Sequence, residues 1–176
     1  MPATLTHLIP ASELAQGQAG AIRNQVIEKM VAMASKEGNL AIDKLIVRDI
    51  RPAGDLDYGT EDWFENTGAT TGTYETMTTG TSADGRWIGI YGIKDDSDTA
   101  GSCSMIKFNI GGADRVIWSL QSLNEDDGFV GISPAGVVIP QRTPYTISRY
   151  VIRASRAAHL VLKGVVVEAR GLVVSP

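Results

Sequence analysis

The chain has 176 residues, of which 43% are hydrophobic and 20% charged, a composition that fits one folded domain and excludes a disordered or collagen-like chain. Its single cysteine excludes an intramolecular disulfide, and its two histidines, His7 and His159, are too few and too far apart for most zinc sites. The formal net charge is −4, but the charges are unevenly distributed. Residues 1–50 contain five acids and five bases, residues 51–130 contain fourteen acids and five bases, and residues 131–176 contain one acid and six bases.

The first residues, MPATLTHLIPASELAQ, lack the cationic start and apolar run of a secretory signal. No stretch of the chain approaches 18 consecutive apolar residues. We therefore expect neither export through a signal peptide nor insertion into a membrane.

Residues 12–36 carry apolar or small side chains at gaps of three or four, which predicts an amphipathic helix. Ser12 is a suitable N-cap and Gly38 a suitable C-terminal stop, while Gly17 and Gly20 weaken the first turns, so that 20–36 is the firm part. We expect the apolar stripe to cover a sheet of its own domain; the alternative is that the helix leaves the domain to bind a neighbouring subunit. The stripe consists of Ala15, Ala19, Ile22, Val26, Met30 and Met33.

After Gly38 the hydrophobic period changes to two, with β-branched residues between regularly spaced turn residues, which is typical of strands. The segment 159–168 is apolar on both faces for most of its length, so we expect it to lie centrally in a sheet. The predicted strands are 40–50, 72–79, 87–93, 104–110, 115–120, 136–139, 145–152, 159–168 and a short tail strand, 172–174.

No helix separates these successive strands, which excludes a parallel α/β sheet. We predict a mainly β fold, an antiparallel β-sandwich of jelly-roll type with eight or nine strands and one N-terminal amphipathic α-helix. The expected division is an N-terminal arm and helix at 1–38 and a β-sandwich domain at 39–176.

The segment 52–82 is rich in threonine and glycine, with eight of the chain's fourteen threonines in 67–81. Such a polar segment predicts either an edge hairpin or a long loop or arm, and we favour the solvated loop. Trp63 and Phe64 are candidate interface anchors within it, because aromatic residues dominate interface energetics. The alternative is that the pair tucks into the rim of its own domain.

The last third of the chain is basic and follows an acidic middle segment. Opposite charges of this kind either pair within the chain, which we favour, or link copies head to tail. In the second case Arg149, Arg153 and Arg156 are candidate interface residues. Nucleic-acid binding is not expected, since the arginines form no basic run and no aromatic-rich motif accompanies them.

No catalytic motif is present in the sequence. The acidic stretches 55–61 and 95–98 could supply oxygen ligands to calcium, but they lack EF-hand spacing and are more typical of solvated loops. Glu75, Glu125 and Glu168 would have to converge to form a glycosidase pair, and Cys103 would need a neighbouring base to act as a nucleophile. We predict a protein that is not an enzyme, with no catalytic residue, metal site or cofactor.

The closing segments YTISRYVIRA (145–154) and HLVLKGVVVEARG (159–171) resemble the last strands of small jelly-roll structural proteins of virus particles. These proteins include phage capsid decoration, cement and minor capsid proteins, and the resemblance covers about 103–176. It implies a capsid-associated β-sandwich that bridges shell subunits as a homo-oligomer, with the major capsid protein or other virion subunits as partners. It also implies a location on the capsid surface after synthesis in the host cytoplasm, and it assigns no site residues.

The function expected from the sequence is therefore that of a virion structural protein that decorates or cements a capsid, in keeping with that resemblance. The alternative is a carbohydrate-binding β-sandwich module of a virion fibre or spike, with Trp63, Trp87, Tyr91 or Tyr74 as a platform for sugar rings. A cupin-like enzyme ranks third, because its chemistry needs a histidine-rich metal site.

Overall fold

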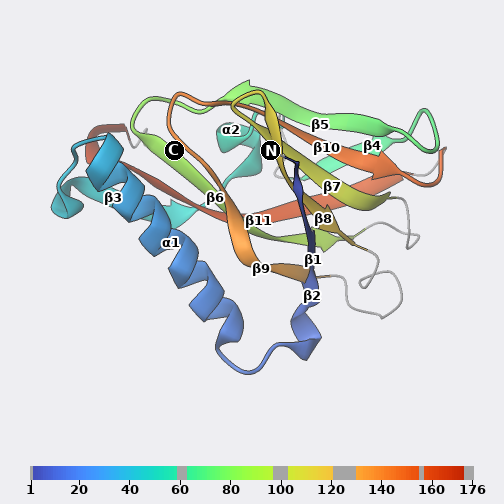
Figure 1. The fold of residues 1–176 in the computed structure, drawn as a ribbon, viewed down its shortest axis with the longest axis horizontal. Coiled ribbons are helices and arrows are strands. Elements are labelled where there is room, and N and C mark those ends of the chain that lie inside the picture. Colours follow the sequence, from blue (N-terminus) through green and yellow to red (C-terminus); the bar gives the residue numbers. More distant parts are fainter. Residues whose placement is uncertain (1, 59–62, 97–102, 121–129, 155–156, 173–176) are drawn as a thin grey trace.

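Two β-sheets pack face to face in the computed structural model, and one long helix lies against the outer side of one of them (Figure 1). The structure describes residues 2–58, 63–96, 103–120, 130–154 and 157–172. Sheet A has five strands, in the order β1 (Thr4–His7), β8 (Ala113–Ser119), β7 (Cys103–Ile110), β10 (Pro144–Val151) and β5 (Tyr74–Thr81). Sheet B has the order β2 (Ile9–Pro10), β9 (Val130–Ile139), β6 (Arg86–Asp95), β11 (Ala157–Ala169) and β3 (Leu45–Asp49), and β4 (Phe64–Thr67) also pairs with β11.

The fold class predicted from the sequence, a mainly β sandwich with one N-terminal helix, is confirmed. From β5 to β11 the chain crosses between the sheets at nearly every step, and only β7 and β8 are consecutive strands paired in one sheet. The prediction of an antiparallel sandwich is wrong for one pair of strands, since β1 runs parallel to β8. The N-terminal segment thus supplies an edge strand to each sheet, two strands that the sequence pattern did not reveal.

The core between the sheets is built from strand residues whose side chains alternate inward. Strand β10 contributes Tyr145 and Ile147, and β11 contributes Leu160, Leu162 and Val166. The expected central position of 159–168 is confirmed, since β11 lies between β6 on one side and β3 with β4 on the other.

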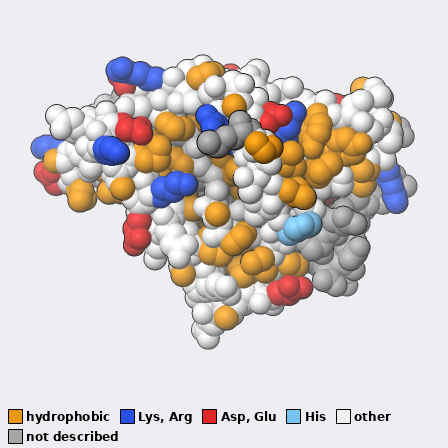
Figure 2. Space-filling view, viewed as in Figure 1, with side chains coloured by type: hydrophobic (Ala, Val, Ile, Leu, Met, Phe, Trp, Pro, Cys, Tyr) orange, Lys and Arg blue, Asp and Glu red, His pale blue; other side chains and the backbone are white. Residues whose placement is uncertain are grey.

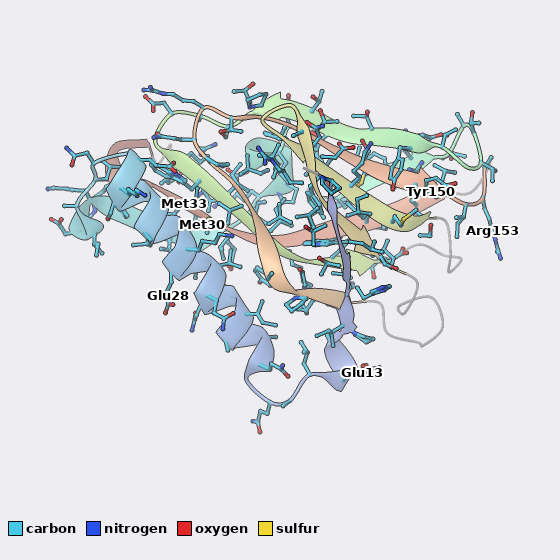
Figure 3. The ribbon with its side chains drawn as sticks, viewed as in Figure 1. Glu13, Glu28, Met30, Met33, Tyr150 and Arg153 are labelled. Carbon is cyan, nitrogen blue, oxygen red and sulfur yellow. The ribbon has the colours of Figure 1, made fainter. Side chains whose placement is uncertain are left out.

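Helix α1 (Gln18–Glu37) packs against β6, β9 and β11 through four buried side chains. The expectation that it covers a sheet of its own domain is confirmed, and Figure 3 shows Met30 and Met33 on the part of the helix that faces the sheet. The predicted start at 12 is wrong, because Gly17 adopts a left-handed φ of 84° that a helix interior cannot contain. A separate 3₁₀ turn occupies Ala11–Glu13. The four buried side chains are Ile22, Val26, Met30 and Ala34.

The strand predicted at 72–79 is confirmed as β5, whereas the solvated loop favoured for 52–82 is wrong for the described part of that segment. It contains the short helix α2 (Pro52–Asp55), β4 and the eight-residue strand β5, which pairs with β10. Threonine is β-branched and partly polar, so a Thr-rich segment suits an edge strand that keeps one face in water. Three bounds also differ. The segment 40–50 contains a 3₁₀ turn (Ile42–Lys44) before β3, and the strand predicted at 136–139 begins earlier, as β9 (Val130–Ile139). A 3₁₀ turn (Arg170–Leu172) replaces the start of the tail strand predicted at 172–174, whose other residues lie outside the described ranges.

Among the described residues, no helix combines the length and the apolar character that crossing a membrane would require.

Candidate functional site

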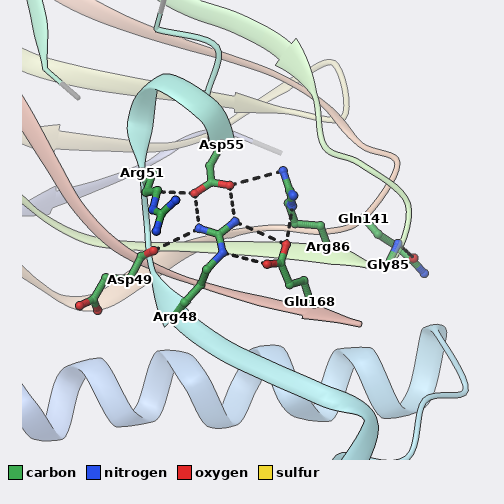
Figure 4. Close-up of polar contacts among 8 residues, drawn as sticks. All are labelled: Arg48, Asp49, Arg51, Asp55, Gly85, Arg86, Gln141 and Glu168. Carbon is green, nitrogen blue, oxygen red and sulfur yellow. Dashed lines mark hydrogen bonds and ion pairs between the residues drawn. The ribbon is translucent and has the colours of Figure 1, made fainter. Parts of the chain in front are cut away.

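A cluster of two arginines and two carboxylates closes one end of the sandwich (Figure 4). Arg48 donates two hydrogen bonds to Asp55, from Nη1 to Oδ2 at 2.7 Å and from Nη2 to Oδ1 at 2.6 Å. Glu168 accepts from Arg48 Nε at 2.8 Å and from Arg86 Nε at 2.9 Å. The backbone N–H of Arg51 donates a further hydrogen bond to Asp55, to Oδ2 at 2.8 Å. Each carboxylate is thus held by more than one donor.

Strand alternation explains why these charges meet inside the protein. Arg48 of β3 and Glu168 of β11 belong to the inward-facing sets of their strands, next to Val166 and away from the helix. Pro52 occupies the first turn of α2, where its missing N–H costs nothing, and the turn brings Asp55 over the two arginines. The hydrogen bond to Asp55 raises the pKa of Arg48, against the opposing effect of burial.

The side chains of Asp55 and Glu168 are 3% and 1% exposed, so this cluster is not a surface on which a ligand can settle. Its geometry serves to join β3, α2, β6 and β11. Asp55 is therefore an ion-pair partner and not part of the calcium loop considered for 55–61. No group of three or more metal-ligating side chains occurs among the residues that the structure describes.

The carboxylates considered for glycoside hydrolysis do not form a pair in the described part of the chain. Glu168 bonds to Arg48 and Arg86, whereas Glu75 accepts hydrogen bonds from the backbone of Ala69 and from Arg149. Glu125 lies outside the described ranges.

Arg149 was expected at an interface, and the structure corrects this. Its side chain is fully buried inside the sandwich, where Nη2 donates to Glu75 Oε2 at 3.2 Å and the guanidinium lies 5.0 Å from the ring centre of Phe64. The strand carries Tyr145, Ile147, Arg149 and Val151 on one face, so the alternation places the arginine inward together with its apolar neighbours.

The other predicted interface residues have different positions. Phe64 is 9% exposed and belongs to the core, so the rim alternative is correct for it. Trp63 is 37% exposed and lies edge-on against His159, with 5.5 Å between ring centres. Arg153 is exposed at the end of the sandwich away from α1 (Figure 3), and Arg156 lies outside the described ranges.

The two outer sides of the sandwich differ in how they are covered. Helix α1 covers part of sheet B, where it packs against β6, β9 and β11, and the outer side of sheet A faces away from this helix (Figure 1). Strand pairing places the outward residues of sheet A in rows that cross the sheet. We call this surface the open face; it is defined by Leu5, Tyr74, Met105, Lys107, Ile117 and Tyr150.

The open face has an aromatic end and an aliphatic end. At the aromatic end, Tyr74 and Tyr150 meet edge to face at 5.1 Å, and the Tyr74 hydroxyl lies 3.7 Å from Met105 Sδ. Lys107 Nζ lies 4.4 Å from the centre of the Tyr74 ring, which is a cation–π contact that attracts the ammonium group to the ring. At the aliphatic end, Leu5 pairs with Ile117 and is 55% exposed. Burial raises the pKa of Tyr74, so its hydroxyl stays a neutral donor.

Figure 2 shows a patch of hydrophobic side chains on the right of the molecule, where Figure 1 places β7, β8 and β10, and further patches below the centre and on the left. Most charged side chains in this view lie toward the left and the rim. The sequence pattern does not reveal the open face, because its members come from five separate strands, each of which contributes only one or two of them. The signal that could have found it is the outward alternation of apolar residues in strands that also have an apolar inward face.

Comparison of the chain with protein-family models gave no match, and comparison with curated proteins also gave none.

Proposed function

We propose that this chain is a non-enzymatic structural protein of a virus particle, a decoration or cement protein that bridges shell subunits as a homo-oligomer. The two-sheet sandwich supports this proposal, since it agrees with the fold that the resemblance of the closing strands implies. The ion pairs of Glu168 and Glu75 support the non-enzymatic part of the proposal, because arginines of the same chain engage both carboxylates.

The observation that carries the proposal is the open face. A sheet normally buries one side against a core and presents polar side chains on the other. Here the outward side presents Leu5, Met105, Ile117 and two tyrosines, beside a polar row formed by Thr79, Thr146, Asn109 and Asp114. Tyrosine and methionine are enriched in protein interfaces, and contiguous exposed apolar surface marks interaction sites.

The outer side of sheet A, of which the open face is a part, has the size of a stable contact. Five strands spaced about 4.8 Å apart, each about seven residues long at about 3.3 Å per residue, give a projected area of about 550 Å². Side-chain relief raises the accessible area above this projection. One partner in a standard interface buries about 800 Å².

The proposal is tested by light scattering during size-exclusion chromatography of the purified chain. The wild type is expected to form a defined multimer of the 18.8 kDa chain. Leu5→Lys and Tyr150→Lys are expected to shift it toward the monomer, because each places a charge in the contact. Ile42→Lys is the matched control, since Ile42 is 70% exposed and outside the open face.

Association with a particle needs its own measurement. Particles purified from the source of the sequence are expected to contain the chain in a fixed copy number, measured by quantitative mass spectrometry. A monomeric wild type that is also missing from such particles would contradict the proposal.

The carbohydrate-binding alternative is favoured by one observation, the exposed Tyr74 ring beside Tyr150. Exposed aromatic faces can stack on sugar rings. Trp87, considered for the same role, is fully buried under α1 and is wrong as a platform. A glycan array probed with wild type and Tyr74→Ala separates the two functions, because sugar binding lost in the variant would support the alternative.

A further inference from the structure

A second surface feature lies on the opposite sheet, beside the helix. An open surface hollow of about 530 Å³ lies between α1, the end of β3 and the outer side of β6 and β11. This volume is in the range of small-molecule sites. We call it the helix-edge pocket; it is lined by Arg23, Asp49, Ile50, Tyr91, Val161, Leu162, Lys163 and Gly164.

Irregular strand pairing builds this pocket. The register between β11 and β6 shifts between Lys163 and Gly164, so that Lys163 pairs with Gly92 and Gly164 with Ile90. Tyr91 is therefore left out of the ladder, as the extra residue of a bulge is. Bulges re-aim side chains, and this one places Tyr91 and Lys163 in the same hollow. A Cβ at Gly164 would lie 2.5 Å from the Gly89 carbonyl oxygen, so the close strand approach at the pocket floor requires glycine.

The charges around the pocket do not balance. Arg23 Nη2 donates to Asp49 Oδ1 at 2.9 Å, which pairs one cation with the one carboxylate among the lining residues. Lys163 forms no ion pair within the described part of the chain, while the nearby Lys94 is held by Asp96 at 2.6 Å. The pocket thus has one cation without a counter-charge.

The other residues of the pocket add a hydroxyl donor and apolar surface beside Lys163. The Tyr91 phenol lies next to Arg23, and burial raises its pKa while Arg23 opposes the rise, so it is a neutral hydroxyl donor at neutral pH. Ile50 and Val161, both partly exposed, provide apolar surface. A few convergent polar groups over apolar walls are the usual composition of a small-molecule site.

We propose that the helix-edge pocket binds a small oxyanion, a carboxylate or phosphate group, through Lys163, Arg23 and the Tyr91 hydroxyl. The apolar walls would accept the body that carries the anionic group. This site is separate from the open face and does not depend on the proposed structural function.

The test is an amide NMR titration of the full chain with sodium phosphate and, separately, with sodium acetate at constant ionic strength. Saturable shifts are expected at Ile50, Lys163 and Gly164 with at least one of the two salts, with a Kd on the order of 1 mM or below. The salt that binds more tightly identifies a phosphate or a carboxylate as the preferred group.

Lys163→Met, which keeps the aliphatic stem, is expected to weaken binding at least tenfold, and Arg23→Gln is expected to weaken it as well. Lys107→Met, on the open face, is the matched control and should leave the affinity unchanged. Spectra of each variant without ligand establish that it is folded. Shifts that do not saturate with either salt, or that persist in folded Lys163→Met, would overturn the proposal.

Discussion

At the scale of single residues, the buried charge cluster makes the sharpest energetic prediction. Glu168 is 1% exposed and holds both Arg48 and Arg86. Removing one partner of a buried ion pair leaves an uncompensated charge, so we expect Glu168→Gln to lower the free energy of unfolding by about 3 kcal/mol. Urea denaturation followed by tryptophan fluorescence measures this change.

The control for this variant is Asp84→Asn, which breaks the fully exposed pair between Asp84 and Arg142 at 2.5 Å. Exposed pairs contribute little because water and salt screen them, so the urea midpoint should stay close to that of the wild type. Equal effects of the two variants would show that the buried cluster does not stabilise the fold.

Glu75 gives a prediction about pH. Burial alone would raise its pKa, but the N–H groups of Thr70 and Ala69 and the guanidinium of Arg149 outweigh it, so the pKa lies below the ordinary 4.5. A depressed carboxylate pKa stabilises the fold above the ordinary value, and this contribution is lost as the pH falls through the folded-state pKa. The stability difference between wild type and Glu75→Gln should therefore shrink between neutral pH and about pH 3.

Urea midpoints of both proteins across this range measure the Glu75 effect. A difference that is the same at both ends of the range would show that the carboxylate charge is not the stabilising feature.

For Arg149, the sequence predicts which side chains share its face of the strand but not whether that face is buried. The alternation in 145–152 correctly groups Arg149 with Tyr145 and Ile147 on one face. It cannot show that this face is the buried one, because an arginine among apolar residues usually indicates water nearby. The decisive partner, Glu75, is 74 positions away and becomes a neighbour only through the pairing of β5 with β10.

At the scale of elements, the contact between α1 and sheet B depends on a glycine. A Cβ at Gly89 would lie 2.4 Å from Val26 Cγ1 and 2.8 Å from Met30 Cε. We expect Gly89→Ala to destabilise the fold by about 1–3 kcal/mol, because the helix must move away from β6. Thermal and urea unfolding of the variant measure the effect.

Two further variants make the Gly89 experiment specific. Gly20→Ala, at a helix position with nothing within 4 Å, should instead stabilise the protein by up to about 1 kcal/mol. Val26→Ala removes the closest contact, so its cost and that of Gly89→Ala should be less than additive. Strict additivity would mean that the helix does not pack on Gly89.

Elements with a strong period were predicted well from the sequence, and short edge elements were not. The helical stripe and the strands that carry an apolar face were found because each buries a continuous set of side chains. Strands β1 and β2 have four and two residues and lie at sheet edges, so their sequences contain little periodic signal. Strand β5 was found at 72–79, but the loop favoured for the segment around it was wrong, because threonines suit either water or an edge strand.

At the scale of the whole molecule, the opposite charges of the acidic middle and the basic end are used within the chain in two described pairs. Arg142 lies 2.5 Å from Asp84 and Arg149 lies 3.2 Å from Glu75. This confirms intramolecular pairing, the favoured alternative, for these residues. The sheet order could not have been predicted, because strands far apart in sequence meet in it.

The same arrangement predicts how a multimer responds to salt. The open face is mainly apolar and aromatic, and its one cation, Lys107, already pairs with Asp114 at 3.4 Å. At a salt concentration of about 0.5 M, interactions between exposed charges are screened beyond a few ångströms. The free energy gained by burying apolar surface is not weakened by salt in this way. The multimer measured by light scattering should therefore persist at high salt. Dissociation by salt would instead locate the contact between oppositely charged ends of neighbouring copies, and the open face would then lose its role in assembly.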